Sequence, residues 1–277
     1  MPIRARRSCL TVPASSERML AKAPSLGADE IIVDLEDAVA AAEKERARGL
    51  AVAALQRGPL GRTTALRVNE RSTPWWEDDL RAAAEARPDV VVLPKVESPE
   101  DVSAAAELLP SGTGLEAQIE TATGLAAAEQ IAAAGHGLEA VVFGPADLAA
   151  SLGVPVLTIG AGASEYALAR VLASARASGL QAVDGPHARL DDELGLVLAA
   201  RRALDHGYDG KWVIHPRQIG PVNLLFTPSP AEVKRARRIL EASSGGAVRL
   251  EGELVDEASR RLAEALLKRT ELLEEPA

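Results

Sequence analysis

Residues 115–124 read LEAQIETATG, a short run that ends in a carboxylate, Glu120, and continues into small residues and a glycine. The run 115–119 is predicted to be a buried strand of a parallel sheet, because it is short and looks largely apolar. A lone acidic side chain at the C-terminal end of such a strand is unfavourable unless a positive group meets it. Glu120 is therefore predicted to be one half of a metal site.

A second carboxylate follows one strand and helix later, in AVVFGPADLA at residues 140–149. Residues 140–143 are predicted to form the next strand, and Asp147 follows its Gly-Pro turn. Two carboxylates at neighbouring strand ends suit Mg²⁺, which takes one or two protein carboxylates and leaves positions for water and substrate. The alternative is that Glu120 pairs with a nearby Arg or Lys, while Asp147 caps a helix that starts at Ala146.

The composition favours a sheet covered by helices. The 277 residues suffice for one α/β barrel, and since 47% are hydrophobic but only 3% aromatic, Ala, Leu, Val and Ile must build the core.

A net charge of -9 argues against a general nucleic-acid or anionic-membrane binder. The single cysteine, Cys9, allows no intrachain disulfide, so a reducing, cytoplasmic setting is expected. No export or membrane segment is evident.

Strand-like and helix-like stretches alternate along the chain, and eight strands are predicted. They are residues 8–12, 31–34, 64–68, 90–93, 115–119, 140–143, 181–183 and 211–214. This number is typical of a (β/α)₈ TIM barrel, with a doubly wound sheet as the alternative.

The positions of the polar residues favour the barrel. They lie at or just past the C-terminal ends of the predicted strands, where barrel enzymes build their active sites. These residues are Asp34, Glu36, Asp37, Arg67, Lys95, Glu120, Asp147, Asp184 and His215.

The barrel is predicted to fill residues 1–227, and residues 228–277 to form C-terminal helices. An amphipathic helix is expected to about residue 242, then a flexible break at 243–246, a short extended piece and a final amphipathic helix. This tail is expected to be an extra helix on its own barrel or a lid over a neighbouring subunit. The Gly-rich stretch 157–163 lacks the spacing and the lysine of a phosphate loop, so it is interpreted as an ordinary loop.

Several side chains have both a functional and a structural interpretation. Arg67 is placed to hold a substrate carboxylate through two parallel hydrogen bonds, or to pair with the acidic residues 34–37, and both can hold together. Arg18 and Lys22 lie four residues apart on one helix face and could bind a coenzyme phosphate, although a solvated helix face is the commoner explanation and the spacing alone favours it. His215 is a candidate base or donor, or a packed histidine. Asp256 is explained without function, by the dipole of the last helix.

With these residues in view, the chain resembles the citrate lyase β-subunit (CitE-like) family of the HpcH/HpaI aldolase superfamily, whose relatives include malyl-CoA and citramalyl-CoA lyases. The resemblance runs nearly end to end. It is carried, in order, by LTVPASSERMLAKA, IIVDLEDAV, LRVNE, VVLPKVES, QIETATG, FGPADLAASLG, WVIHPRQI and EGELVD.

The resemblance implies a (β/α)₈ barrel, usually a homotrimer, with Mg²⁺ held by Glu120 and Asp147. It implies that Arg67 binds the carboxylate of the oxo-acid fragment, supported by an acidic cluster that includes Asp37. It further implies coenzyme phosphates on Arg18 and Lys22, a thioester pocket lined by Ile214 and His215, and Asp256 of a neighbouring subunit as the catalytic acid/base. Citrate lyase proper works in a complex with α and γ subunits and an acyl-carrier thioester.

The activity that the resemblance implies is Mg²⁺-dependent cleavage of a 3-hydroxy-3-carboxy acyl thioester of CoA or acyl carrier protein. The products would be a 2-oxo acid, such as oxaloacetate, pyruvate or glyoxylate, and an acetyl-type thioester. Two alternatives stay open: a metal-dependent pyruvate-type aldolase, and a non-catalytic protein that binds an oxo acid and regulates or assembles with other subunits.

Overall fold

The structure is a computed structural model that describes residues 3–155, 165–242 and 247–274. It consists of two compact units, Met1–Asn223 and Leu224–Ala277. The predicted loop at 157–163 and the predicted break at 243–246 lie outside the described residues. None of the helices in the described ranges has the length and apolar content that crossing a bilayer requires.

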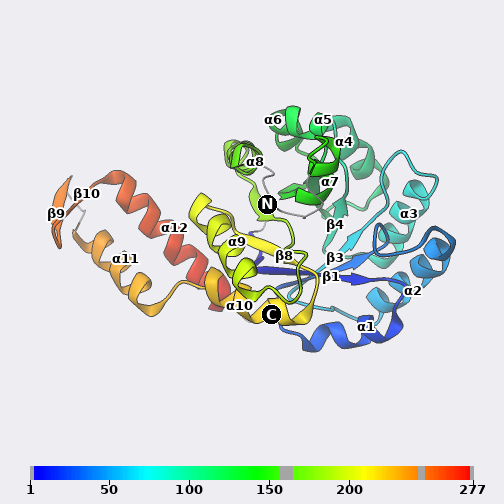
Figure 1. Cartoon of the computed structure of the whole chain (residues 1–277), viewed down its shortest axis with the longest axis horizontal. Coiled ribbons are helices and arrows are strands. Elements are labelled where there is room, and N and C mark those ends of the chain that lie inside the picture. The colour runs from blue at the N-terminus through cyan, green and yellow to red at the C-terminus, as the bar shows by residue number, and fades with distance from the viewer. Residues whose placement is uncertain (1–2, 156–164, 243–246, 275–277) are drawn as a thin grey trace. The chain divides into compact units, whose positions relative to one another are not determined.

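The first unit is a closed barrel of eight parallel strands, so the TIM barrel prediction is confirmed and the open doubly wound sheet is wrong. The sheet closes because β1 pairs with β8 as well as with β2. Helices surround the strands (Figure 1). They are β1 Ser8–Pro13, β2 Glu30–Asp34, β3 Thr63–Arg67, β4 Val90–Leu93, β5 Gly114–Ile119, β6 Leu138–Phe143, β7 Gln181–Asp184 and β8 Gly210–Val213.

Several of the helices that follow the strands begin at side-chain caps. Ser16 accepts a hydrogen bond from the Met19 amide and caps α1, and Thr121 accepts one from the Gly124 amide and caps α5. Ser98 and Asp101 form a capping box at the start of α4. The helices are α1 Glu17–Lys22, α2 Lys44–Gln56, α3 Trp76–Ala86, α4 Pro99–Leu108, α5 Ala122–Ala126, α6 Ala128–Ala132, α7 Pro145–Ser151, α8 Glu165–Ala177, α9 Glu193–His206 and α10 Pro216–Phe226.

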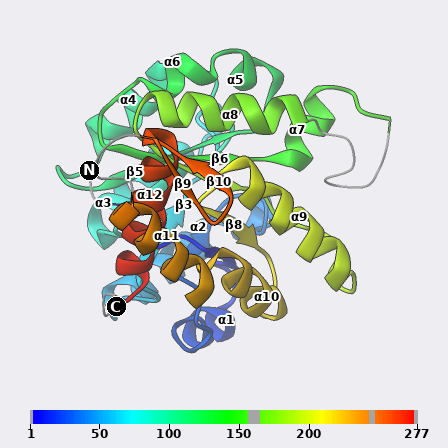
Figure 2. The same ribbon diagram turned by 90° about the vertical axis from the view of Figure 1, so that its left-hand side faces the viewer.

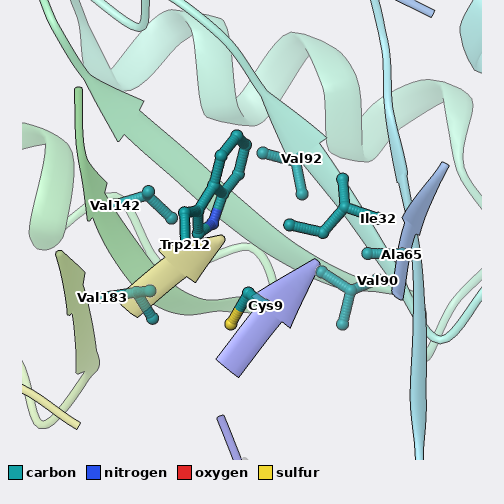
Figure 3. Packing of buried hydrophobic residues seen from close by; sticks show 8 residues of the cluster. All are labelled: Cys9, Ile32, Ala65, Val90, Val92, Val142, Val183 and Trp212. Atoms are coloured by element: carbon teal, nitrogen blue, oxygen red, sulfur yellow. The ribbon is translucent and has the colours of Figure 1, made fainter. Parts of the chain in front are cut away.

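Small and β-branched side chains fill the middle of the barrel, together with one tryptophan (Figure 3). They are Cys9, Ile32, Ala65, Val90, Val92, Val142, Val183 and Trp212, all buried. Because successive side chains of a strand point to opposite faces, the residues two positions before and after a core residue also point inward. Ile32 is thus flanked by Glu30 and Asp34, which face the two ends of the barrel.

The second unit contains two long helices joined by a hairpin. Helix α11 spans Pro230–Ala242, and α12 spans Glu257–Glu274. Strands β9 Val248–Leu250 and β10 Glu253–Val255 pair antiparallel between them. The two helices pack along each other, as the turned view shows (Figure 2). The predicted helices of the tail are confirmed, whereas their role as a lid on a neighbouring subunit stays a prediction.

Candidate active site

Arg67, the last residue of β3, is buried at the C-terminal end of the barrel, which we call the mouth. Its Nε and Nη2 atoms each donate to Asp34 at the end of β2, over 2.7 Å. Its Nη1 atom lies 3.0 Å from Glu36 Oε2, and the guanidinium is 5.3 Å from the ring centroid of Trp212. A guanidinium has five N–H groups, so Arg67 retains donors for a further carboxylate. The structural pairing of Arg67 is therefore compatible with substrate binding.

The loop after β2 is fixed by a buried lysine. Lys44 donates to the carbonyl oxygens of Leu35 and Glu36, over 2.8 and 2.7 Å, and to Asn69 Oδ1 over 2.6 Å. Burial lowers the pKa of Lys44. These hydrogen bonds from Lys44 hold the loop so that Glu36 faces the mouth, where its carboxylate pairs with Arg67 and with the ammonium of Lys95.

Glu120 follows β5 and is 1% exposed. Its Oε1 atom accepts a hydrogen bond from the backbone N–H of Lys95 over 2.8 Å, and its Oε2 atom accepts one from Gln118 Nε2 over 2.6 Å. Two donors on separate oxygens hold the carboxylate in a single orientation. A Cβ at Gly144 would lie 2.3 Å from Glu120 Cβ, so only glycine allows β6 to end this close to Glu120.

Asp147 lies in the first turn of α7, next to Glu120. Helix α7 begins at Pro145 with Gly144 at its N-cap, and Asp147 is not the capping residue. The Asp147 side chain is 37% exposed, and its Oδ1 atom lies 3.9 Å from Lys95 Nζ. The alternative of a helix-capping Asp147 is therefore wrong, and this carboxylate stands partly open to solvent.

The electrostatics of this pair fit a divalent cation. Burial, and next the negative charge of Asp147, raise the pKa of Glu120 to about 8. Arg67 does not supply enough positive charge to offset this effect, because its guanidinium already pairs with Asp34 and Glu36. A carboxylate pair that its basic neighbours do not fully neutralise, with oxygen ligands only, suits Mg²⁺. Glu120 and Asp147 are the residues that could hold it.

The other predicted binding residues lie around this mouth or on nearby helices. Arg18 and Lys22 are both exposed on α1. Asp37 is exposed, with Oδ1 3.9 Å from Lys95 Nζ. Ile214 follows β8 and is 40% exposed, and His215 Nδ1 accepts a hydrogen bond from the Arg217 amide at the start of α10. Their roles toward a coenzyme or thioester stay predictions.

Asp256 belongs to the second unit, where it caps α12. Its Oδ1 atom accepts hydrogen bonds from the backbone N–H groups of Ala258 and Ser259, over 3.0 and 3.1 Å. The pKa of Asp256 is lowered, chiefly by the hydrogen bond from the backbone N–H of Ser259. This arrangement fits the helix-terminus explanation of Asp256, and its role as catalytic acid/base stays a prediction.

A second ionic cluster lies at the opposite, N-terminal end of the barrel. Arg6 Nε donates to Glu116 Oε1 over 2.7 Å and to Glu30 Oε2 over 3.1 Å, and Arg6 Nη2 lies 3.1 Å from Glu139 Oε2. The Arg6 side chain also contacts Gln181 Oε1. Burial, and next the charge of Glu116, raise the pKa of Glu30 to about 8. We call these residues the closed-end cluster.

Several of these residues are not among those predicted from the sequence, although the sequence carries a signal for one of them. The stretch 115–119 was predicted as an apolar strand, yet Glu116, Gln118 and Glu120 recur at every second position and face the barrel interior. This alternation could have placed Gln118 beside Glu120. The proximity of Trp212 to Arg67 carries no local signal, because β3 and β8 are far apart in the chain.

Comparisons with known proteins show the family to which this chain belongs. Residues 7–216 match the HpcH/HpaI aldolase/citrate lyase family. The chain is 40% identical to a (3S)-malyl-CoA thioesterase of Cereibacter sphaeroides, over 85% of this chain and 82% of that protein. It is 35% identical to citrate lyase subunit beta of Escherichia coli K12, over 97% and 94%.

A crystal structure of protein CitE from Mycobacterium tuberculosis, in complex with magnesium, acetoacetate and coenzyme A, is similar to most of this chain. It superposes with a TM-score of 0.81 at 36% identity, covering 95% of this chain and 97% of that one. The resemblance inferred from the motifs is confirmed. This chain belongs to the HpcH/HpaI aldolase/citrate lyase family.

Proposed function

We propose that this protein is a Mg²⁺-dependent carbon-carbon lyase that cleaves a 3-hydroxy-3-carboxy acyl thioester into a 2-oxo acid and an acetyl-type thioester. The observation that carries the proposal is the convergence of a buried guanidinium, Arg67, with two carboxylates, Glu120 and Asp147, at the mouth. An arginine and an oxygen-only metal pair together match the charges of a 2-hydroxy or 2-oxo acid. The relatives with citrate lyase and CitE names support this class of substrate.

Glu120, Asp147 and Arg67 would each have a distinct role in this reaction. When bound by Glu120 and Asp147, Mg²⁺ would supply Lewis-acid polarisation of the substrate's oxygens. Arg67 holds the substrate carboxylate through its remaining N–H groups, and Asp34 and Glu36 keep the guanidinium in a fixed plane. The two hydrogen bonds to Glu120 keep that ligand oriented before substrate arrives.

In the cleavage step, the substrate hydroxyl gives up its proton to solvent, and its carbon becomes the carbonyl carbon of the oxo acid. The electron pair of the broken carbon-carbon bond passes to the thioester fragment as an enolate. Asp256 of a neighbouring subunit, or a water that it positions, delivers a proton to the enolate carbon, a general-acid step typically worth about 10²–10⁴-fold in rate. The net change is the movement of one proton from oxygen to carbon.

A second candidate is hydrolysis of the thioester, which the 40% identity to a (3S)-malyl-CoA thioesterase favours. Hydrolysis releases a free thiol and a hydroxy acid, whereas carbon-carbon cleavage releases an oxo acid and keeps the thioester. Purified protein with Mg²⁺ would be incubated with malyl-CoA, citramalyl-CoA and a citryl thioester. Oxo acid would be measured with a carbonyl reagent, and free thiol with a thiol reagent.

We expect oxo acid without stoichiometric free thiol. Free thiol without oxo acid would replace the lyase proposal with the thioesterase. Cleavage of free hydroxy-oxo acids in preference to thioesters would favour the aldolase alternative. Oxo-acid binding without any turnover would favour the regulatory alternative.

A further inference from the structure

Lys95 contacts both carboxylates of the candidate metal pair, each through a different group. Its backbone N–H donates to Glu120 Oε1 over 2.8 Å, and its ammonium Nζ lies 3.9 Å from Asp147 Oδ1. The N–H reaches Glu120 because Lys95 adopts a left-handed backbone conformation, with φ of 49°. A non-glycine residue rarely adopts this conformation, and it recurs where function demands a particular geometry.

The ammonium of Lys95 also has a second anchor that does not involve the metal pair. It forms a short ion pair with Glu36 Oε1 and lies 3.9 Å from Asp37 Oδ1. The Lys95 side chain is 21% exposed, so these charges interact in a partly desolvated site. Lys95 can thus move off Asp147 and still keep an ion pair with Glu36.

We propose that Lys95 is the positioning residue that sets the divalent-metal affinity of the mouth. Its backbone fixes Glu120 as a ligand, while its ammonium competes with the metal ion for Asp147 and retreats onto Glu36 when the ion binds. This inference rests on the proposed function for the assignment of Glu120 and Asp147 as the metal ligands.

The direction in which the Kd for Mg²⁺ changes on mutation of Lys95 distinguishes competition with the metal ion from a purely structural role. Lys95→Met removes the competing charge and keeps both the backbone N–H and most of the side-chain volume. The metal ion then meets Asp147 without repulsion from a neighbouring cation, so the Kd for Mg²⁺ should fall about ten-fold. Damage to the site would instead weaken Mg²⁺ binding.

The test is calorimetric titration of MgCl₂ alone into the full chain, without substrate. Lys95→Arg, which keeps the charge, should bind Mg²⁺ within about two-fold of the wild type. Arg71→Met is the matched control, because Arg71 lines the same cavity as Lys95 but pairs with Asp101. Arg71→Met should leave the Kd unchanged. A thermal melt with and without Mg²⁺ gives a second measurement, in which Lys95→Met should gain more from the ion than the wild type gains.

The outcomes separate the two proposals. If the wild type binds Mg²⁺, Glu120→Gln abolishes the binding and folded Lys95→Met binds no more tightly, the Lys95 inference alone is overturned. Lys95→Gln replaces Lys95→Met in the same comparison if the methionine variant does not fold. If the wild type binds no Mg²⁺, or if Glu120→Gln binds it as well as the wild type, both the metal assignment and the Lys95 inference fail.

Discussion

The two ends of the barrel carry similar charges and differ in access. At the mouth, Arg67 is buried against Asp34 and Glu36. In the closed-end cluster, Arg6 is buried against several glutamates. At each end, burial raises the pKa of one glutamate to about 8.

The difference lies in what each cluster leaves open. The side chains of Arg6, Glu30 and Glu116 are 0% exposed. At the mouth, Asp147 is 37% exposed. A perturbed pKa therefore marks both a structural network and a candidate active site, and access to solvent distinguishes them. We expect mutations at the mouth to change activity, and mutations in the closed-end cluster to change stability.

The largest expected effect is that of Glu120→Gln on activity. The amide cannot serve as an anionic ligand, so Mg²⁺-dependent turnover should fall at least about 10²–10³-fold, while the fold persists. Oxo-acid release measures the loss, and circular dichroism checks the fold. Glu129→Gln, an exposed carboxylate on α6, is the matched control and should keep full activity. Full Mg²⁺-dependent activity in Glu120→Gln would contradict the metal assignment.

The next effect is that of Arg6→Met on stability. Removing the cation leaves buried glutamates uncompensated, so the free energy of unfolding should fall by about 3–5 kcal/mol. Urea denaturation measures the loss, and the activity per folded molecule should not change. Exposed Arg57→Met should have little effect on either quantity. A loss of activity in folded Arg6→Met would show that the two ends are coupled.

A smaller effect concerns the pH dependence of stability. The pKa of Glu30 is raised from 4.5 to about 8, so between these values the folded protein binds more protons than the unfolded chain. Stability should therefore fall as the pH rises from 5 to 8, and Glu30 contributes at most about 1.4 kcal/mol per pH unit to this slope. Glu116→Gln removes the neighbouring charge and should flatten this slope. Parallel slopes in the two proteins, measured by urea denaturation, would refute the coupling of Glu30 with Glu116.

The smallest effect is expected on the exposed face of α1. Replacing Arg18 and Lys22 together by Ala should raise the KM for a CoA thioester by roughly five-fold, because exposed ionic contacts are individually weak. High salt should reduce the difference. Arg201→Ala, which removes an exposed cation from α9, is the control and should leave the KM unchanged. An unchanged KM in the double variant would favour a merely solvated helix face.

The order of strands and helices could be predicted from the sequence because each strand has a local signal. The predicted strands at 31–34 and 90–93 differ from β2 and β4 by one residue at most. The cap at Ser16 was likewise predictable, since a capping side chain contacts residues only three positions away. These are interactions between near neighbours, which a single sequence records.

The partners of the charged residues could not be predicted in the same way. Arg67 was expected to face a substrate or an acidic neighbour, and the structure shows that Asp34 and Glu36 hold it while donors remain. The closed-end cluster was not anticipated, because its members lie up to 175 positions apart in the chain. A charge in a sequence does not specify its counter-charge.

The sequence by itself predicted eight strands and a row of polar residues at their ends, it favoured a barrel over a doubly wound sheet, and its motifs indicated the family. Periodicity suffices for the strands, because it depends on residues close in the chain, whereas the family was indicated by the resemblance of the motifs. Only the tertiary structure decided which carboxylates lie together, that Lys95 contacts both Glu120 and Asp147, and that one end of the barrel is closed. Closing the sheet brings distant strands into contact, and burial then sets the protonation of the groups that meet there.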